Sequence, residues 1–255
     1  MVRIVSSLRR LYGSGPPVYV HTDNAAQRGL NFSALCAAVG CEWSYSAEAA
    51  GNPKFYKKSY EKELGQGLVY LTRLIERMRV CACEFLVAIE DDTCVRRRAE
   101  LPPRIGDVGG LPAPLFSATF LAHAENVSAT PIPRPTPWGC AGACYYRSAS
   151  WTTRPITSSL VEEAFENDAW AVGYMDAVGP ALGLLMGLRV VPWTALAQTH
   201  LEGQGFMQRV PVEERAFDHN CAEQRAARDE AQTSCGDVLW SEMSMRHRRG
   251  REARA

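Results

Sequence analysis

The sequence predicts an α/β fold in which a mostly parallel, Rossmann-like central sheet is flanked by helices. Three observations lead to this class. Helical and strand patterns alternate through the first hundred residues, which is typical of α/β proteins. The stretch "CEFLVAIE", residues 83–90, is nearly continuous in apolar side chains, as a central strand covered on both faces would be. The 255 residues suffice for one sizeable domain or two small ones.

The first elements follow one another in a regular order. A helix is expected over 3–13, ending at Gly13, and the proline pair after it leads into a strand at 18–24, "VYVHTDN". A second helix and strand are expected at 31–40 and 41–47. The pattern therefore predicts repeated helix–strand units at the start of the chain.

The best supported helix begins near Ser59 and precedes the apolar strand. Its apolar side chains recur at steps of three and four, while charged residues lie off that face. The stripe consists of Leu64, Leu68, Leu71, Ile75 and Met78. We therefore expect one face of this helix to pack on the sheet.

Beyond the acidic end of that strand the chain becomes rich in proline and glycine, as loops are. We expect a strand at 115–124 and a helix that begins near Ser159. A further helix is expected from about 167 to 178, because the Gly179-Pro180 pair that follows should stop it.

Composition limits the classes of partner. Residues 1–210 are expected to form one domain, and residues 211–255 a polar extension that is partly disordered. Basic and acidic residues both number 28, so the net charge does not indicate a nucleic-acid partner. The longest apolar stretch, 180–193, contains Arg189 and is shorter than the roughly 20 residues that cross a bilayer. No membrane span is therefore expected.

The cysteines leave the cellular compartment open. There are nine, an odd number, and pairs such as Cys36 with Cys41 or Cys140 with Cys144 could form disulfides in a secretory lumen. Two Asn-x-Ser sequons fit the same compartment. Free buried thiols are the alternative. The amino terminus lacks the apolar core of a signal peptide, so the chain as written would stay in the cytosol.

Three consecutive acidic residues, Glu90, Asp91 and Asp92, end the apolar strand. Adjacent carboxylates repel one another by about 1 to 4 kcal/mol per close pair, so the cluster needs a positive partner. Oxygen ligands at a strand end suit Mg²⁺ or Mn²⁺, which usually share protein carboxylates with substrate phosphates. The alternative is a solvated turn that pairs with the arginines at 96–98.

The stretch "FLVAIEDDT", residues 85–93, resembles the metal motif of GT-A fold glycosyltransferases. That motif is of the D-x-D type, and the E-D-D form is similar to the one in the N-acetylglucosaminyltransferase I group. The resemblance implies that Asp92 binds Mn²⁺ or Mg²⁺ directly. It also implies that Glu90 and Asp91 lie nearer the ribose or the sugar of the donor.

Two more segments are similar to elements around the family's donor site. The strand "VYVHTDN" would place Asp23 and Asn24 near the nucleoside. The stretch "PTPWGCAGACYYR", residues 135–147, resembles the glycine-rich segment that shapes the donor and acceptor pockets. There Gly139 and Gly142 would allow close backbone approach, and a structural glycine turn is the alternative.

The stretch "FENDAWAVGYM", residues 165–175, resembles the segment that supplies the catalytic carboxylate of inverting members. The resemblance implies that Asp168 is the base, with Glu166 close by, both at a helix amino terminus where the dipole favours the ionised form. A simple helix cap is the alternative. His200 is the candidate for a third metal or phosphate ligand, and His219 is a second one.

The sequence therefore predicts a metal-dependent glycosyltransferase. It would move a sugar from a UDP- or GDP-sugar to a hydroxyl of a glycan, protein or lipid acceptor, with inversion if Asp168 is the base. In a retaining enzyme Asp168 would position the substrate instead. A related nucleotidyltransferase and an inactive GT-A-like binding or scaffold protein are the alternatives.

One departure from the family concerns its first strand, which normally precedes the helix that begins here near Arg3. The chain has no room for that strand before this helix, so the first strand is expected to be missing. A lost segment could also have carried a membrane anchor, and the protein would then lie in the Golgi or another secretory lumen.

Overall fold

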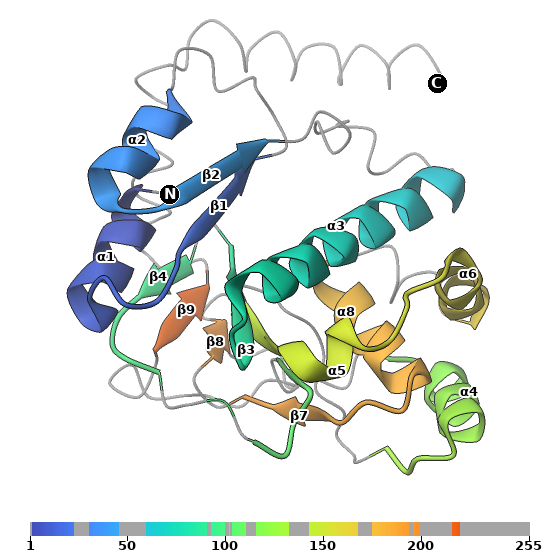
Figure 1. The fold of residues 1–255 in the computed structure, drawn as a ribbon. Helices are drawn as coiled ribbons and strands as arrows, with labels where there is room; N and C mark the ends of the chain where they lie inside the picture. Colours follow the sequence, from blue (N-terminus) through green and yellow to red (C-terminus); the bar gives the residue numbers. More distant parts are fainter. Residues whose placement is uncertain are drawn as a thin grey trace, which may run out of the picture.

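The computed structural model describes residues 2–22, 31–45, 60–90, 93–99, 102, 104–110, 116–132, 143–167, 175–193, 196–198 and 216–219. The helices are α1 (Val2–Tyr12), α2 (Phe32–Val39), α3 (Tyr60–Cys81), α4 (Ala118–Ser128), α5 (Ser148–Thr152), α6 (Ser158–Asn167) and α8 (Met175–Leu185). The strands are β1 (Tyr19–Thr22), β2 (Glu42–Tyr45), β3 (Phe85–Ile89), β4 (Thr93–Val95), β5 (Val108–Gly110), β6 (Ala143–Arg147), β7 (Val190–Pro192), β8 (Leu196–Gln198) and β9 (Phe217–His219). Helices and strands are mixed along the chain, so the predicted α/β class is confirmed (Figure 1).

The described strands form three sheets, and their directions are mixed. β1 and β2 pair in parallel. The four-stranded sheet has the order β3-β6-β5-β7, in which β6 runs against both of its neighbours and β5 is parallel to β7. In the third sheet β9 is antiparallel to β4 and parallel to β8. The expected mostly parallel sheet is therefore corrected to a mixed one, because β6 reverses direction within it.

The start of the chain forms the expected helix–strand unit. α2 connects the parallel strands β1 and β2. The side chain of Asn31 caps α2 by accepting a hydrogen bond from the Ala34 N–H at 3.0 Å. Gly40 ends the helix with φ 72°, a conformation that glycine adopts easily. The predicted Cys36–Cys41 disulfide is present and ties the end of α2 to the residue before β2.

Two predicted helices are confirmed. α1 ends before Gly13, whose N–H donates to the Arg9 carbonyl at 2.9 Å. α3 carries the expected apolar stripe, and the three stripe residues whose side chains are described, Leu71, Ile75 and Met78, are buried. None of the helices within the described ranges combines the length and the apolar character that crossing a bilayer requires.

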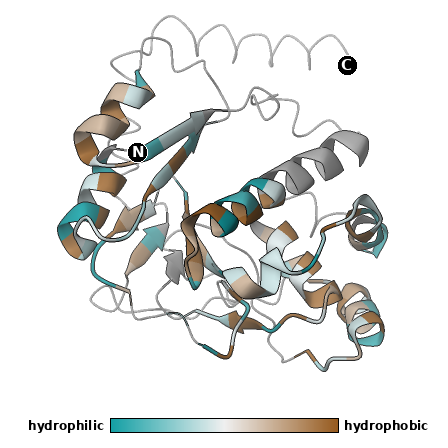
Figure 2. Cartoon of the chain, in the orientation of Figure 1, coloured by the Kyte–Doolittle hydropathy of each residue, from teal (hydrophilic) through white to brown (hydrophobic). Residues whose placement is uncertain are grey.

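The four-stranded sheet separates two hydrophobic cores. Side chains alternate between the faces of a strand, so neighbours in the sequence enter different cores. One face packs against the helices α3, α4, α5, α6 and α8, and the sheet contributes Leu86, Ala88, Val108, Cys144, Tyr146 and Val190. The other face packs against α1 and the sheet of β4 and β9, and contributes Phe85, Ile89, Ala143, Tyr145 and Val191. Figure 2 accordingly shows α8 largely in brown, the colour of hydrophobic residues.

β3 has a different environment from the one its sequence predicts. In the described sheet it lies at one end of the strand order, with β6 as its hydrogen-bonded neighbour. Val87, at its centre, is 38% exposed. The expectation of a central strand is therefore wrong for the described part of the molecule, although side chains on both faces of β3 pack into a core. A continuous apolar run indicates burial on both sides but does not show how many strands flank it.

The expected strand at 115–124 is a helix. α4 begins at Ala118, and the Ser117 hydroxyl caps it by accepting from the Phe120 N–H at 3.1 Å. Phe120, Leu121 and Ala124 are buried, which is the spacing of one helix face. The β-branched and aromatic residues suggested a strand, and packing against α6 and α8 outweighs that preference.

The Gly179-Pro180 pair does not stop a helix, as was expected, but lies inside α8. A Cβ atom on Gly179 would lie 2.4 Å from the Tyr146 hydroxyl, so this position needs glycine for close packing. Residues 177–185 of α8 are all buried. Burial of this apolar helix therefore outweighs the hydrogen bond that Pro180 cannot donate.

Tyr145 is the centre of an aromatic cluster in the second core. Its ring packs edge-on against Phe85 and Trp193, with centroid distances of 5.5 and 5.3 Å. Burial raises the pKa of Tyr145 from 10.0 to about 12; Arg147 opposes this shift and Asp107 adds to it. The folded protein therefore keeps a phenolic proton that the unfolded chain releases near pH 10.

This difference predicts a loss of stability in alkali. Between pH 10 and 12 the folded state binds more protons than the unfolded state, so the free energy of unfolding should fall as pH rises. The slope from this one group is at most about 1.4 kcal/mol per pH unit. Urea unfolding at successive pH values should show a smaller slope in Tyr145→Phe. Equal slopes in the two proteins would contradict the prediction.

Candidate functional site

The carboxyl ends of three strands meet at one edge of the four-stranded sheet. β3, β5 and β7 run in the same direction because β3 and β5 are both antiparallel to β6, and β7 is parallel to β5. They end at Ile89, Gly110 and Pro192. Ile89 pairs with Ala143, the first residue of β6 and the one directly after Gly142. The start of β6 therefore lies at the same edge as Glu90.

Glu90 begins the acidic triplet at this edge and is half-buried. Its carbonyl accepts a hydrogen bond from the Thr93 N–H at 3.2 Å. This bond joins the two described residues that flank Asp91 and Asp92. This bond therefore connects the end of β3, in the four-stranded sheet, to the start of β4, in the three-stranded sheet.

The small sheet brings distant parts of the chain to the same place. Thr93, the residue after Asp92, is fully buried and pairs with His219 at the end of β9. On the other side of β9, His219 pairs with Gln198 at the end of β8, two residues before His200. Backbone pairing therefore brings Thr93, His219 and Gln198 together at one end of three strands.

A buried ion pair lies beside this pairing. Nε and Nη2 of Arg96 are both 2.9 Å from Oδ2 of Asp218, whose side chain is 3% exposed. The other end of the 96–98 arginine run points elsewhere, since Arg98 donates to the Leu11 carbonyl and lies over the Tyr12 ring. Sequence reasoning named the arginines at 96–98 as partners of the acidic triplet but missed Asp218, to which Arg96 binds. An aspartate between Phe217 and His219 in a short apolar run was the available signal.

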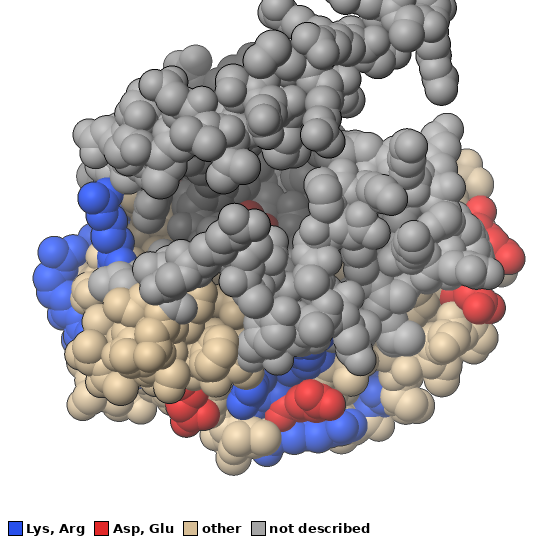
Figure 3. All heavy atoms as spheres, turned by 90° about the horizontal axis from the view of Figure 1, so that it is seen from above, with Lys and Arg blue, Asp and Glu red and all other residues tan. Residues whose placement is uncertain are grey.

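The structure corrects the expected position of Glu166. It lies in the last turn of α6, not at a helix amino terminus, because α6 begins at Ser158 and continues through Asn167. Its side chain is exposed, and Figure 3 shows exposed acidic side chains on the side where α6 lies. α6 packs against α3, α4 and α8. Glu166 therefore does not have the position at a helix amino terminus that the sequence predicted.

Most of the predicted site residues lie outside the described residues. These are Asp23, Asn24, Asp91, Asp92, Gly139, Gly142, Asp168 and His200, and for His219 the backbone alone is described. Within the described ranges, no group of three or more His, Cys, Asp or Glu side chains could hold a metal ion. Four residues from the predicted polar extension, 216–219, belong to the folded part, with Ala216, Phe217 and Asp218 buried.

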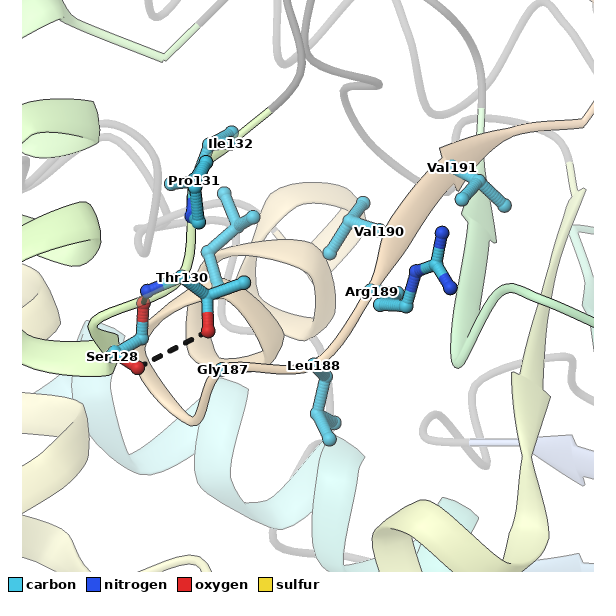
Figure 4. Close-up of a pocket in the computed structure, with 10 residues that line it drawn as sticks. Ser128, Thr130, Pro131, Ile132, Gly187, Leu188, Arg189, Val190 and Val191 are labelled. Atoms are coloured by element: carbon cyan, nitrogen blue, oxygen red, sulfur yellow. Dashed lines mark hydrogen bonds between the residues drawn. The ribbon is translucent and has the colours of Figure 1, made fainter.

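A cavity of about 230 Å³ lies away from the acidic edge. It is formed by the segment after α4 and by the turn from α8 into β7, near the amino end of β7 (Figure 4). Arg189 belongs to this turn, and its backbone N–H donates to Oδ2 of Asp107 at 2.8 Å. Since the acidic triplet follows the carboxyl end of β3, the cavity and the candidate site are at opposite ends of the strands.

Comparison with known proteins gives no family assignment. No protein-family model matches the chain, and no curated protein matches it. Among solved structures, the chain is similar to a glycosyltransferase involved in the glycosylation of the major capsid of PBCV-1. The identity is 12%, the match covers 86% of this chain and 100% of the other, and the TM-score is 0.40. A similarity at this level establishes neither the activity nor the fold family of this chain.

Proposed function

We propose that this chain is a metal-dependent glycosyltransferase with a GT-A-like site at the acidic edge. The observation that carries the proposal is the pairing of Thr93 with His219. Thr93 directly follows Asp92 in the chain, His219 is more than a hundred residues away, and Glu90 directly follows β3. Ligands of open α/β sheets bind at such an edge.

The residues at this edge have the chemistry that a divalent ion requires. Glu90 is a half-buried carboxylate. In this proposal Asp91, Asp92, His200 and His219 would add the other oxygen and nitrogen donors. Mn²⁺ or Mg²⁺ bound there would neutralise the charge that develops on the leaving diphosphate of the donor. In this proposal Asp92 is the direct ligand, and His200 or His219 is the third.

The remaining residues would bind and orient the two substrates. Glu90 and Asp91 would lie near the ribose or sugar of a UDP- or GDP-sugar, and Asp23 with Asn24 near the nucleoside. The acceptor would be a hydroxyl of a glycan, protein or lipid. Asp168 would take the proton of that hydroxyl, so the anomeric configuration would invert.

Metal-dependent turnover of the donor tests the proposal. The chain is incubated with UDP- and GDP-sugars and a mixture of acceptor sugars, and release of UDP or GDP is measured. We expect release with Mn²⁺, loss of release with EDTA, and recovery when Mn²⁺ is restored. A rate of UDP or GDP release that changes neither with EDTA nor with restored Mn²⁺ would contradict a metal-dependent enzyme. Transfer of a nucleotide instead of a sugar would favour a nucleotidyltransferase.

A further inference from the structure

The strand pair in which Thr93 lies opposite His219 is short. β4 and β9 contain three residues each, and their pairing is Thr93 with His219, Cys94 with Asp218, and Val95 with Phe217. A slip of one residue would turn every side chain of such a strand to the opposite face. Three residue pairs provide few backbone bonds to prevent a slip. Cys94 of β4 is held by a disulfide, and a side-chain interaction between the two strands adds to it.

Arg96 and Asp218 supply that interaction. Asp218 lies opposite Cys94. Arg96 is two residues after Cys94 in the chain, so the ion pair crosses the two strands diagonally. The Arg96 N–H also donates to the Ala216 carbonyl at 2.9 Å. One residue therefore holds β9 by its backbone at 216 and by its guanidinium at 218.

The ion pair depends on the correct alignment of the strands. The Asp218 carboxylate is 3% exposed, so a slip that moved it away from Arg96 would leave a buried charge without this partner. Val95 and Phe217, which face the second core, are also buried in the observed alignment. Charge and packing therefore both select the alignment that places His219 opposite the residue after Asp92.

We propose that Arg96 and Asp218 are positioning residues: they fix the alignment of β4 on β9, and so the pairing of Thr93 with His219 on which the proposed metal site depends. This inference rests on the proposed function, because the metal is part of that proposal. Arginine is the suitable residue for this role, since two of its nitrogens approach one carboxylate oxygen. The single ammonium group of a lysine cannot reproduce that contact.

The test compares Arg96→Lys and Arg96→Ala with Arg98→Ala in the full chain. Arg98 belongs to the same arginine run, but it contacts Leu11 and Tyr12 of α1, not β9. Free Mn²⁺ is counted by electron paramagnetic resonance at a temperature where thermal scans show each protein folded. We expect Mn²⁺ affinity to fall by about 10- to 100-fold in the Arg96 variants, as for other residues that orient metal ligands. Arg98→Ala should bind Mn²⁺ like the original protein.

Hydrogen exchange gives a readout of alignment that needs no metal. The Arg96 amide, bonded to Ala216, should exchange faster in Arg96→Lys than in the original protein. Unchanged exchange together with unchanged Mn²⁺ affinity, even with a lower melting temperature, would overturn the positioning role. If the original protein binds no Mn²⁺, the proposed function fails. The exchange rates then still decide whether the ion pair holds the alignment.

Discussion

Replacing Asp168 with asparagine is expected to reduce sugar transfer by about 10²- to 10⁴-fold, which is the usual contribution of a general base. Asparagine has nearly the same shape but cannot accept the proton of the acceptor hydroxyl. Binding of nucleotide with Mn²⁺ should be unchanged, because Asp168 is proposed to act on the acceptor and not on the donor. The measurement is the rate of transfer beside a nucleotide-binding titration of the same protein.

Glu162→Gln provides the matched control for this prediction. Glu162 is an exposed acid on α6, the helix that ends just before Asp168. Its replacement removes one negative charge from the same region, and transfer should continue at the original rate. If Asp168→Asn retains full transfer activity, Asp168 is not the base. If both activity and nucleotide binding are lost, the residue serves the donor site or the fold.

Replacing Gly109 with alanine is expected to destabilise the fold by about 3 kcal/mol or more, as overpacking of a rigid core does. An alanine Cβ at this position would lie 1.8 Å from Cε1 of Tyr145 and 2.4 Å from its Cδ1. Phe85 and Trp193 hold the Tyr145 ring from two sides, and the ring is fully buried. To remove this overlap between the alanine Cβ and the ring, β5 and β6 would have to separate.

Gly183→Ala is the control with the opposite sign. Gly183 lies in α8, where the nearest atoms to a new Cβ, on Val108, Val190 and Trp151, are 3.5 to 3.6 Å away. That is ordinary contact, and alanine is favoured over glycine in a helix by roughly 0.5 to 1 kcal/mol. Urea unfolding of both variants should thus give changes of opposite sign. Similar small changes in both would show that Tyr145 can move.

Local features of the fold could be predicted from the sequence. The Cys36–Cys41 disulfide, the end of α1 at Gly13 and the apolar stripe of α3 are confirmed, since each depends on residues that are close in the chain. The failures at α4 and at Gly179 have a common cause. There, contacts with distant residues such as Tyr146 decide the structure, and no local pattern contains them.

In the candidate site, too, features set by nearby residues could be predicted and those set by distant residues could not. That Glu90 would follow a strand was readable from the apolar run before it. The alignment of β4 with β9 was not, because Thr93 and His219 are far apart in the chain and β9 has three residues in a polar region. His200 was the expected histidine, and the pairing places the backbone of His219 opposite Thr93, the residue that follows the acidic triplet.

Binding of UDP and GDP with and without Mn²⁺ tests the central claim most directly, because it needs no acceptor. A ligand that binds the folded state raises stability, by about 2.7 kcal/mol at a hundred times its dissociation constant. We predict that one of these nucleotides raises the melting temperature when Mn²⁺ is present and not when it is absent. Asp92→Asn should abolish the rise. Absence of stabilisation by either nucleotide with Mn²⁺, or a full rise in Asp92→Asn, would contradict a metal-dependent donor site at this edge.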